Sequence, residues 1–345
     1  MASVSVPVVL DVDTGVDDAC ALLFAARHPD LRLVAVSCVG GNAPVDDVVR
    51  NTLVVLDAAG RGDVPVARGA ARPLVERPRH ARHVHGEDGM ADLHWPPSPQ
   101  LPDPRHGVEL LRDVLLDAAR TGDPDDLVTL VPLAPLTNIA LLLRTYPEAA
   151  AGLRRIVFMG GAAAAQGNAT ASAEFNVFHD PEAAAVVLDA AADLGVPVFM
   201  YGLDVFSAPT LSPAEAAEIV AAGRAGGDRA AELAGLLIDF QCHRFGTDAT
   251  IGDAGAVVSL VAPELLTWAE HPVRVELAGT WSRGRTIVDQ RTASPDRDHD
   301  PHGPSPTVVR VALGIDGPAV ARLWRHTVTG GADHDATGTD DRRPS

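Results

Sequence analysis

Short apolar runs alternate with amphipathic segments over roughly the first 200 residues, and this alternation limits the possible folds most strongly. Residues 4–12 and 31–39 are rich in Val and end at polar residues, as buried parallel strands do. Similar runs follow at 127–132, 155–159 and 197–200, and predicted helices separate them at 17–27, 45–59, 136–144 and 181–192. Such βαβ units predict a Rossmann-like α/β fold, a mostly parallel sheet flanked by helices.

The chain shows no internal repeat and no clear linker, so we expect a single domain over residues 1–329. Residues 330–345 are expected to form a disordered tail, because their composition is polar and rich in Gly. Residues 76–104 and 291–306 are rich in Pro and polar side chains and are expected to be irregular. Hydrophobic residues make up 46% of the chain but aromatic ones only 4%, so Ala, Val and Leu must build the core.

Charge and composition exclude several classes of function. The net charge of −18 argues against nucleic acid as a partner. All 28 basic residues are Arg, so neither a phosphate-binding loop lysine nor a Schiff-base lysine is possible. No run of 18 apolar residues exists, which predicts no membrane partner. The odd number of cysteines and the absence of a signal-like N-terminus favour a cytoplasmic location.

A dense acidic cluster follows the first predicted strand. Asp11 and Asp13 close the strand on one face, and Asp17 and Asp18 come after a turn that Gly15 permits. Four carboxylates within eight residues repel one another unless protons or a cation compensate them. Helix capping can explain the last two, but it does not explain two acids at the end of a buried strand. A hard divalent cation with oxygen ligands is the simplest interpretation.

Two other motifs compete for this stretch. An EF-hand loop that starts at Asp11 would need an oxygen-bearing side chain where Gly15 stands and Glu where Leu22 stands. A haloacid-dehalogenase-like phosphatase also begins with a strand and Asp-x-Asp. That class typically uses a later lysine, which this chain lacks, so we keep it only as a distant alternative.

Residues 11–19 (Asp-Val-Asp-Thr-Gly-Val-Asp-Asp-Ala) resemble the opening motif of the inosine–uridine preferring nucleoside hydrolase family. The resemblance extends over roughly residues 5–315, and its segments follow in the family's order. They are 41–42 (Gly-Asn), 84–90 (Val-His-Gly-Glu-Asp-Gly-Met), 134–140 (Ala-Pro-Leu-Thr-Asn-Ile-Ala), 158–161 (Phe-Met-Gly-Gly), 167–168 (Gly-Asn), 173–176 (Ala-Glu-Phe-Asn), 180–184 (Asp-Pro-Glu-Ala-Ala), 251–254 (Ile-Gly-Asp-Ala) and 283–289 (Arg-Gly-Arg-Thr-Ile-Val-Asp). The resemblance implies calcium-dependent hydrolysis of the N-glycosidic bond of a ribonucleoside to free base and ribose.

The resemblance also implies roles for individual residues. Ca²⁺ would be held by the side chains of Asp13, Asp18 and Asp253 and by the backbone carbonyl of Leu133, with Asp13 activating a calcium-bound water. Asp17, Asn42, Asn176 and Asp253 would bind the ribose hydroxyls, and Asn168 and Glu174 would bind the 5′ hydroxyl. We place Met159, Phe240, His243 and Arg244 with the residues that contact the substrate.

The chain departs from the family where the leaving base needs a proton. Many members carry His immediately before the last calcium aspartate, whereas this chain has Gly252 there. We assign the role provisionally to His85, with His243, Arg244 and Trp281 as further candidates. Stacking of the base on an aromatic side chain, or a nucleoside with a better leaving group, would also serve. His80 and His83 are expected to decorate a mobile loop, with His85 as the only functional histidine of the three. A zinc site in the His-rich stretch 79–94 is a weaker possibility, because no cysteine accompanies it.

Two alternatives to ordinary turnover stay open. The chain could be specialised for a modified nucleoside, or it could be a relative that binds ribose or nucleosides without catalysis. Neither the base nor the oligomeric state follows from the sequence. The family resemblance implies a homodimer or homotetramer and a role in nucleoside salvage.

Overall fold

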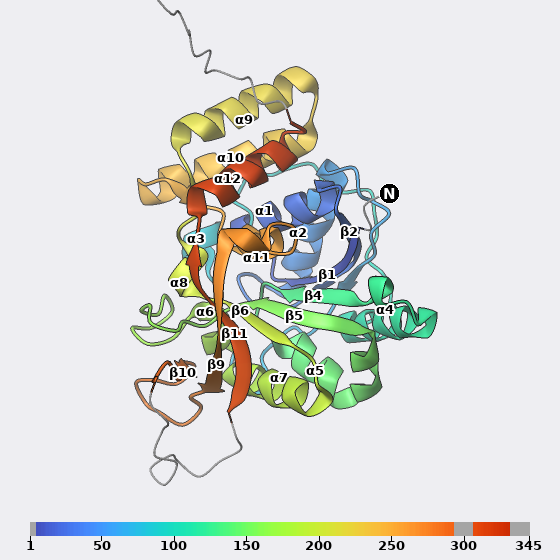
Figure 1. Ribbon diagram of the computed structural model, residues 1–345. Coiled ribbons are helices and arrows are strands. Elements are labelled where there is room, and N and C mark those ends of the chain that lie inside the picture. Colours follow the sequence, from blue (N-terminus) through green and yellow to red (C-terminus); the bar gives the residue numbers. More distant parts are fainter. Residues whose placement is uncertain (1–4, 293–305, 332–345) are drawn as a thin grey trace, which may run out of the picture.

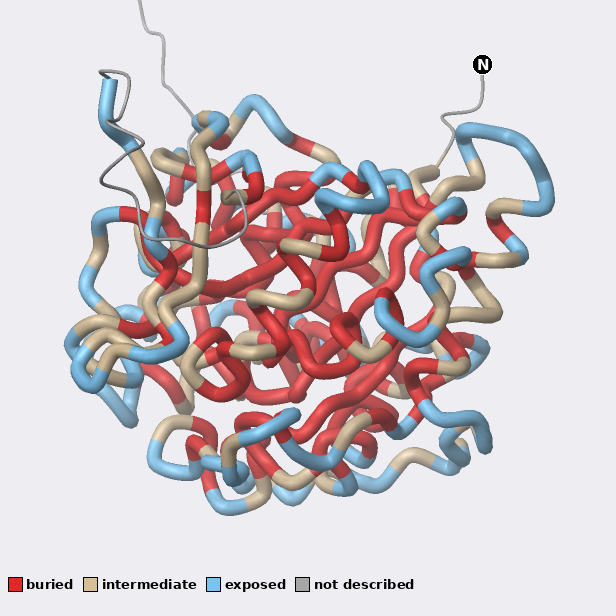
Figure 2. The backbone as a smooth tube through the Cα atoms, turned by 90° about the horizontal axis from the view of Figure 1, so that it is seen from below, coloured by how far each residue is buried: buried red, intermediate tan, exposed pale blue. Residues whose placement is uncertain are grey.

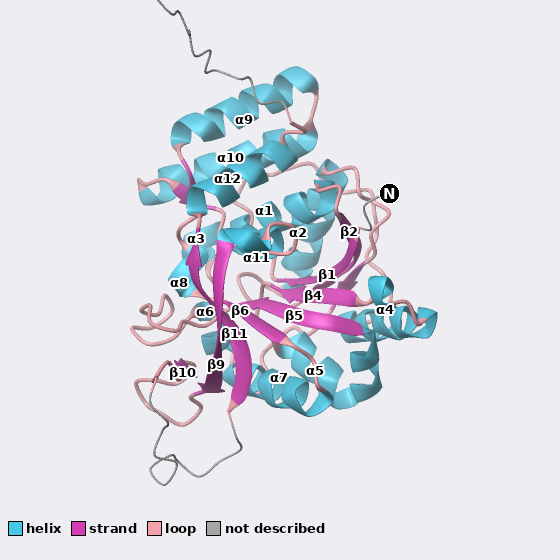
Figure 3. Cartoon of the chain, in the orientation of Figure 1, coloured by secondary structure: helices cyan, strands magenta, loops and turns pink. Residues whose placement is uncertain are grey.

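A central nine-stranded sheet organises the molecule, in a computed structural model that describes residues 5–292 and 306–331. The strands lie in the order β10-β9-β11-β6-β5-β4-β1-β2-β3, and helices cover both faces (Figure 3). From β11 to β3 neighbouring strands are parallel, whereas β9 is antiparallel to both β11 and β10. The strands are β1 Val6–Val12, β2 Leu31–Cys38, β3 Val66–Arg68, β4 Val128–Pro132, β5 Leu153–Met159, β6 Val198–Tyr201, β9 Leu266–Val275, β10 Thr286–Val288 and β11 Thr307–Ile315.

The helices bury two separate apolar clusters against the two faces of the sheet. Figure 1 shows α9, α10 and α12 on one side of the sheet and α5 and α7 on the other. The first face is covered by α1 Val16–Arg27, α2 Val45–Ala58, α10 Arg229–Phe245, α11 Asp253–Val258 and α12 Gly317–Val328, with α9 Pro213–Gly226 packed on α10. The second face is covered by α4 Gly107–Thr121, α5 Thr137–Thr145 and α7 Pro181–Leu194.

Short elements complete the fold at the ends of the strands. They are the helices α3 Arg82–His85, α6 Phe175–His179 and α8 Leu203–Phe206, the 3-10 turns Pro124–Asp126, Pro147–Gly152 and Pro263–Leu265, and the two-stranded pair β7 Thr210–Leu211 and β8 Ala249–Thr250. Figure 2 shows buried residues throughout the middle of the molecule and exposed residues mainly at its periphery. Within the described part of the chain, no helix is both long and apolar enough to cross a bilayer.

The predicted α/β fold with a mostly parallel sheet is confirmed, and all nine predicted elements appear with ends within two residues of the expected ones. The strands β9 to β11 were not predicted. The stretch 76–104 is mostly irregular, as expected, apart from α3. The predicted tail falls largely on residues 332–345 and the second irregular stretch on 293–305, both outside the described residues.

Because β1, β2, β4, β5 and β6 are parallel, their carboxyl ends meet at one edge of the sheet. The loops that follow these strands carry the acidic cluster and most of the predicted site residues. The fold therefore presents one edge at which a ligand can be surrounded by side chains from distant parts of the sequence.

Candidate active site at the carboxyl edge of the sheet

A cavity of about 310 Å³ opens at the carboxyl edge of the sheet. A volume of this size suits a small molecule such as a nucleoside. Its walls come from the loops after β1, β2, β4, β5 and β6, from the segment around α3 and from the start of α11. The lining residues are Asp17, Asn42, Arg79, His80, Ala81, His83, Val84, His85, Leu133, Met159, Asn168, Ala169, Glu174, Phe175, Asn176, Phe178, Phe206 and Asp253.

Three carboxylates form a group that could hold a metal ion. Asp17 and Asp18 lie in the first turn of α1, and Asp253 is the first residue of α11, which packs against α1. One oxygen of each lies within 4.8 Å of one oxygen of the other two. Asp18 also stabilises the start of its helix, because its Oδ2 accepts a hydrogen bond from the Gly15 backbone N–H at 2.9 Å. Asp18 can therefore cap the start of α1 and belong to the acidic group at the same time.

Asp13 is not one of these three carboxylates and does not line the cavity, but it is fully buried beside them, and its backbone N–H donates to Asp18 Oδ1 at 3.3 Å. Its two oxygens accept hydrogen bonds from Asn42, one from the backbone N–H at 2.7 Å and one from the side-chain amide at 3.1 Å. Burial, together with the charge of Asp18, raises the pKa of Asp13 well above its ordinary value. Burial and the Asp17 charge raise the pKa of Asp18 to about 8 and also raise the pKa of Asp253.

The fourth acid of the sequence cluster, Asp11, is not part of this group. Its Oδ1 accepts hydrogen bonds from the Ser37 hydroxyl at 2.5 Å and from the Asn138 amide at 2.8 Å. Burial raises the pKa of Asp11 to about 7. Asp11 therefore links β1 to β2 and α5 beneath the site, and its carboxylate does not belong to the group of Asp17, Asp18 and Asp253.

His85 reaches the acidic group from α3. Its Nδ1 accepts a hydrogen bond from the Val16 backbone N–H at 3.2 Å and lies 3.8 Å from Asp17 Oδ1. Burial lowers the pKa of His85, and the charge of Asp17 opposes this effect. A neutral ring with Nδ1 as acceptor carries its proton on Nε2, the form that can donate to a ligand in the cavity.

The loop before α6 supplies the opposite wall. The Asn176 amide donates to the Leu133 carbonyl at 3.0 Å and to the Met159 carbonyl at 3.2 Å, so it ties together the ends of β4 and β5. The Glu174 carboxylate accepts hydrogen bonds from three backbone N–H groups, including that of Gly161 at 2.9 Å. Asn168 Oδ1 accepts from the Phe175 N–H at 2.8 Å. These polar side chains are thus held in place by the backbone that they face.

An aromatic ring occupies the position beside Gly252. A Cβ atom built on Gly252 would lie 2.1 Å from two ring carbons of Phe206, which itself lines the cavity. Phe206 ends α8, directly after β6. The ring thus leaves no room for a side chain at position 252.

The structure brings most of the predicted site residues together. The predicted residues that line the cavity are Asp17, Asn42, His85, Leu133, Met159, Asn168, Glu174, Asn176 and Asp253. Two further predicted residues, Asp13 and Asp18, are fully buried and do not line it. Among the described residues, the cavity lining does not include Phe240, His243, Arg244 or Trp281. The Trp281 side chain is exposed. Arg244 instead donates two hydrogen bonds, at 3.0 and 2.8 Å, to the His83 carbonyl.

His80 and His83, which were expected only to decorate a mobile loop, both line the cavity together with His85. The His80 ring is held by the Gly41 carbonyl at 3.0 Å, which fixes the loop against the end of β2. Within residues 5–292 and 306–331, the only group of side chains close enough to hold a metal ion is the aspartate group, so the zinc alternative gains no support.

The residues that sequence reasoning missed are mainly aromatic and basic. Phe175, Phe178, Phe206 and Arg79 all line the cavity. Phe206 could have been noticed because it follows the strand predicted at 197–200, and ligands bind where such strands end. Phe175 lies inside a segment already quoted for the family resemblance. No comparable signal marks Arg79.

Comparison with known proteins places this geometry in a family. The model of the inosine-uridine preferring nucleoside hydrolase family matches residues 8–322. The non-specific ribonucleoside hydrolase RihC of Salmonella agona is 38% identical over 316 residues, which cover 91% of this chain and 95% of that protein. Among solved structures, the plant nucleoside hydrolase PpNRh1 has a TM-score of 0.81 at 27% identity, covering 94% of this chain and 98% of that one. The purine-preferring ribonucleoside hydrolase from Gardnerella vaginalis has a TM-score of 0.80 at 28% identity, with coverage of 94% and 98%.

Fold and site together define a hydrolase that acts on N-glycosidic bonds. The chain belongs to the inosine-uridine preferring nucleoside hydrolase family, so the resemblance seen in the sequence is confirmed. Ribonucleoside hydrolysis is accordingly its activity, and the phosphatase alternative falls away.

Proposed function

We propose that this hydrolase depends on calcium and that Asp13 is the base of the reaction. The observation that carries the proposal is the charge of the site. Asp13, Asp18 and Asp253 are buried, Asp17 lies beside them, and within the described residues no arginine forms an ion pair with any of the four. Buried carboxylates without counter-charges are costly. A hard cation with oxygen ligands would compensate them.

The proposed ligands are the side chains of Asp13, Asp18 and Asp253 and the carbonyl oxygen of Leu133. Asp17 is close enough to Asp18 and Asp253 to belong to the same group. Bound Ca²⁺ would neutralise the carboxylates and orient the attacking water and the ribose 2′ and 3′ hydroxyls.

Asp13 then takes a proton from the attacking water. Asn42 holds the two carboxylate oxygens of Asp13 in one orientation, which positions Asp13 as the base. The oxygen of the water forms a bond to C1′ as the C1′–N bond breaks. The surrounding carboxylates stabilise the positive charge that develops on the ribose ring.

The leaving base keeps the electron pair of the broken bond and needs a proton. We assign to His85 a hydrogen bond to this base, because its neutral ring carries a hydrogen on Nε2 and lines the cavity. The base then takes its proton from solvent, to which Asp13 returns the proton that it removed from the attacking water. The remaining polar residues are proposed to bind the sugar: Asp17, Asn42, Asn176 and Asp253 at the 2′ and 3′ side, Asn168 and Glu174 at the 5′ hydroxyl.

The test measures ribose release from a panel of purine, pyrimidine and modified ribonucleosides with Ca²⁺ present. We expect Asp13→Ala to lower kcat by roughly 10²- to 10⁴-fold or more. A chelator should stop turnover, and added Ca²⁺ should restore it. Asp193→Ala, which removes an exposed carboxylate on α7, serves as the charge-matched control.

Calorimetric titration with Ca²⁺ tests the metal separately. Asp18→Asn and Asp253→Asn should each weaken binding strongly, since each removes one anionic ligand. Full activity in chelator would overturn calcium dependence. Binding of Ca²⁺ and ribose without ribose release from any nucleoside would instead identify a non-catalytic binder.

A further inference from the structure

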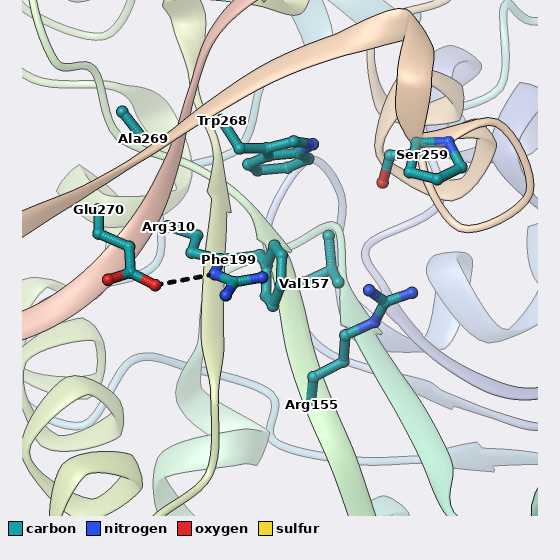
Figure 4. A pocket seen from close by; sticks show the side chains of 9 residues that line it. Arg155, Val157, Phe199, Ser259, Trp268, Ala269, Glu270 and Arg310 are labelled. Carbon is teal, nitrogen blue, oxygen red and sulfur yellow. Dashed lines mark hydrogen bonds and ion pairs between the residues drawn. The ribbon is translucent and has the colours of Figure 1, made fainter.

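A second hollow, which we call the arginine hollow, lies on the sheet away from the active-site cavity. It has a volume of about 370 Å³, and none of its lining residues lines the first cavity. Figure 4 shows its walls, which come from β5, β6, β9 and β11 and from the segment after α11. Arg155 precedes Met159 of the active site by four residues on the same strand, about 13 Å along it. The two sites are therefore separate.

The floor of the arginine hollow is aromatic. The guanidinium carbons of Arg155 and Arg310 lie 5.2 and 5.3 Å from the centre of the Phe199 ring. The Trp268 ring meets Phe199 edge-on, with centroids 5.3 Å apart and an interplanar angle of 81°. In Figure 4 the Phe199 ring stands between the two guanidinium groups, with Trp268 above. Such a floor offers flat apolar surface beside positive charge.

The charges in the hollow are not balanced. Arg310 pairs with Glu270, with Nε 3.1 Å from Oε1. Arg155 forms no ion pair with any carboxylate of the described residues, and its buried Nε has no hydrogen-bond partner there. Burial, and then the charges of Arg154 and Arg310, lower the pKa of Arg155. This uncompensated cation stands out in a chain whose net charge is −18.

An adjoining hollow continues the same surface. It shares Arg155, Phe199, Glu270 and Arg310 with the first and adds Arg154 to the wall. The charge of Arg154 is partly neutralised by Asp125, whose Oδ1 lies 3.7 Å from the Arg154 guanidinium. Arg155 is thus the arginine here whose charge is left for a ligand.

We propose that the arginine hollow binds a small molecule that joins an oxyanion to a flat apolar group. The planar guanidinium of Arg155 donates to the oxygens of a phosphate or carboxylate, a geometry that arginine provides and lysine does not. The flat group lies against Phe199 and Trp268, whose rings give it apolar contact. Nothing in the nucleoside hydrolysis described above uses these residues.

Calorimetric titration of the full chain tests the proposal with four probes. Phenyl phosphate and benzoate carry both features, inorganic phosphate lacks the ring, and phenol lacks the anion. We expect phenyl phosphate or benzoate to bind, inorganic phosphate to bind more weakly and phenol not to bind. The comparison of the two aromatic probes tells whether the hollow selects phosphate or carboxylate.

Variants locate the binding. Arg155→Gln should weaken it at least about tenfold, as the loss of a charge-assisted hydrogen bond implies. Arg155→Lys keeps the charge and should still lose several-fold, because the planar fork is gone. Arg224→Gln removes an exposed arginine on α9 with the same change in net charge and should leave binding unchanged. Ribose release should be unaffected by all three, which separates this result from the proposed catalytic mechanism.

Three outcomes would overturn the proposal. The first is no binding of either aromatic oxyanion at millimolar concentration. The second is equal loss of binding in Arg155→Gln and Arg224→Gln, which would indicate a general effect of charge. The third is a dimer that Arg155→Gln dissociates while no oxyanion binds, which would make the hollow an interface between copies of the chain.

Discussion

The residue with the sharpest steric constraint in the site is Gly252. Gly252→Ala would place a Cβ atom 2.1 Å from the Phe206 ring, so we expect it to lower the free energy of unfolding by about 1–3 kcal/mol. In a Phe206→Ala background the ring is gone, and the same change should cost much less. Chemical unfolding of the four proteins measures this coupling. Gly226→Ala is the control, because a Cβ there meets nothing within 4 Å. Additive effects of the two changes would contradict the packing described here.

Asp11 should make stability depend on pH. Its pKa is raised to about 7 when folded, against about 4 when unfolded, so the folded state binds the extra proton between these values. This contribution to stability is therefore present at low pH and is lost as the pH rises from about 4 to about 7, by at most roughly 4 kcal/mol. Asp11→Asn should reduce the fall. The measurement is the free energy of unfolding of both proteins across this range in chelator. Parallel curves would show that Asp11 does not titrate in this way.

At the scale of elements, the short helix α3 depends on a contact from α10. The Arg244 guanidinium holds the His83 carbonyl through two hydrogen bonds, and His85 follows two residues later. Arg244→Ala should raise the hydrogen-exchange rate of the amides of residues 85 and 86 by about fivefold, as a loss near 1 kcal/mol implies. The exposed neighbour His243 provides the control, since His243→Ala removes no contact to α3. Unchanged exchange in Arg244→Ala would mean that α3 is held by its other contacts.

Arg244 was predicted to contact the substrate, but it supports α3, a helix that contributes to the cavity wall, and does not line the cavity itself. Resemblance to relatives brings the segment near the substrate, but only coordinates tell whether a side chain lines the cavity or supports the loop that does. The predicted strands and helices of the first 200 residues were recovered because buried parallel strands read as continuous apolar runs. The first four residues of β11 alternate between buried and exposed, and most residues of β9 are only half-buried, so neither strand gives a continuous apolar run.

The candidate site was less predictable than the fold. Asp13, Asp17 and Asp18 are close in sequence, so charge alone singled them out, whereas Asp253 could be joined to them only through the family resemblance. The aromatic wall of Phe175, Phe178 and Phe206 carries no charge pattern. It becomes visible only when the loops after β5 and β6 are brought together.

At the scale of the whole molecule, the C-terminal helix is tied to the N-terminal one. The Trp324 indole N–H on α12 donates to the Cys20 carbonyl on α1 at 2.9 Å, across 304 positions of sequence. Trp324→Phe should lower the free energy of unfolding by about 1–3 kcal/mol, because the ring becomes smaller and a buried carbonyl loses a donor. Trp95→Phe is the matched control, since the Trp95 indole N–H has no hydrogen-bond partner among the described residues. Equal effects of the two changes in thermal or chemical unfolding would argue against a special role for this contact.

The position of β11 has a consequence for how the protein is made. This strand lies between β6 and β9, so the sheet remains split until residues 307–315 have been synthesised. α1, which carries Asp17 and Asp18, packs on both α11 and α12. A nascent chain that has emerged only as far as β6 lacks Asp253 and both of these helices. We therefore expect the acidic pocket to form only after translation is nearly complete, so that incomplete chains released early from the ribosome carry neither an assembled metal site nor hydrolase activity.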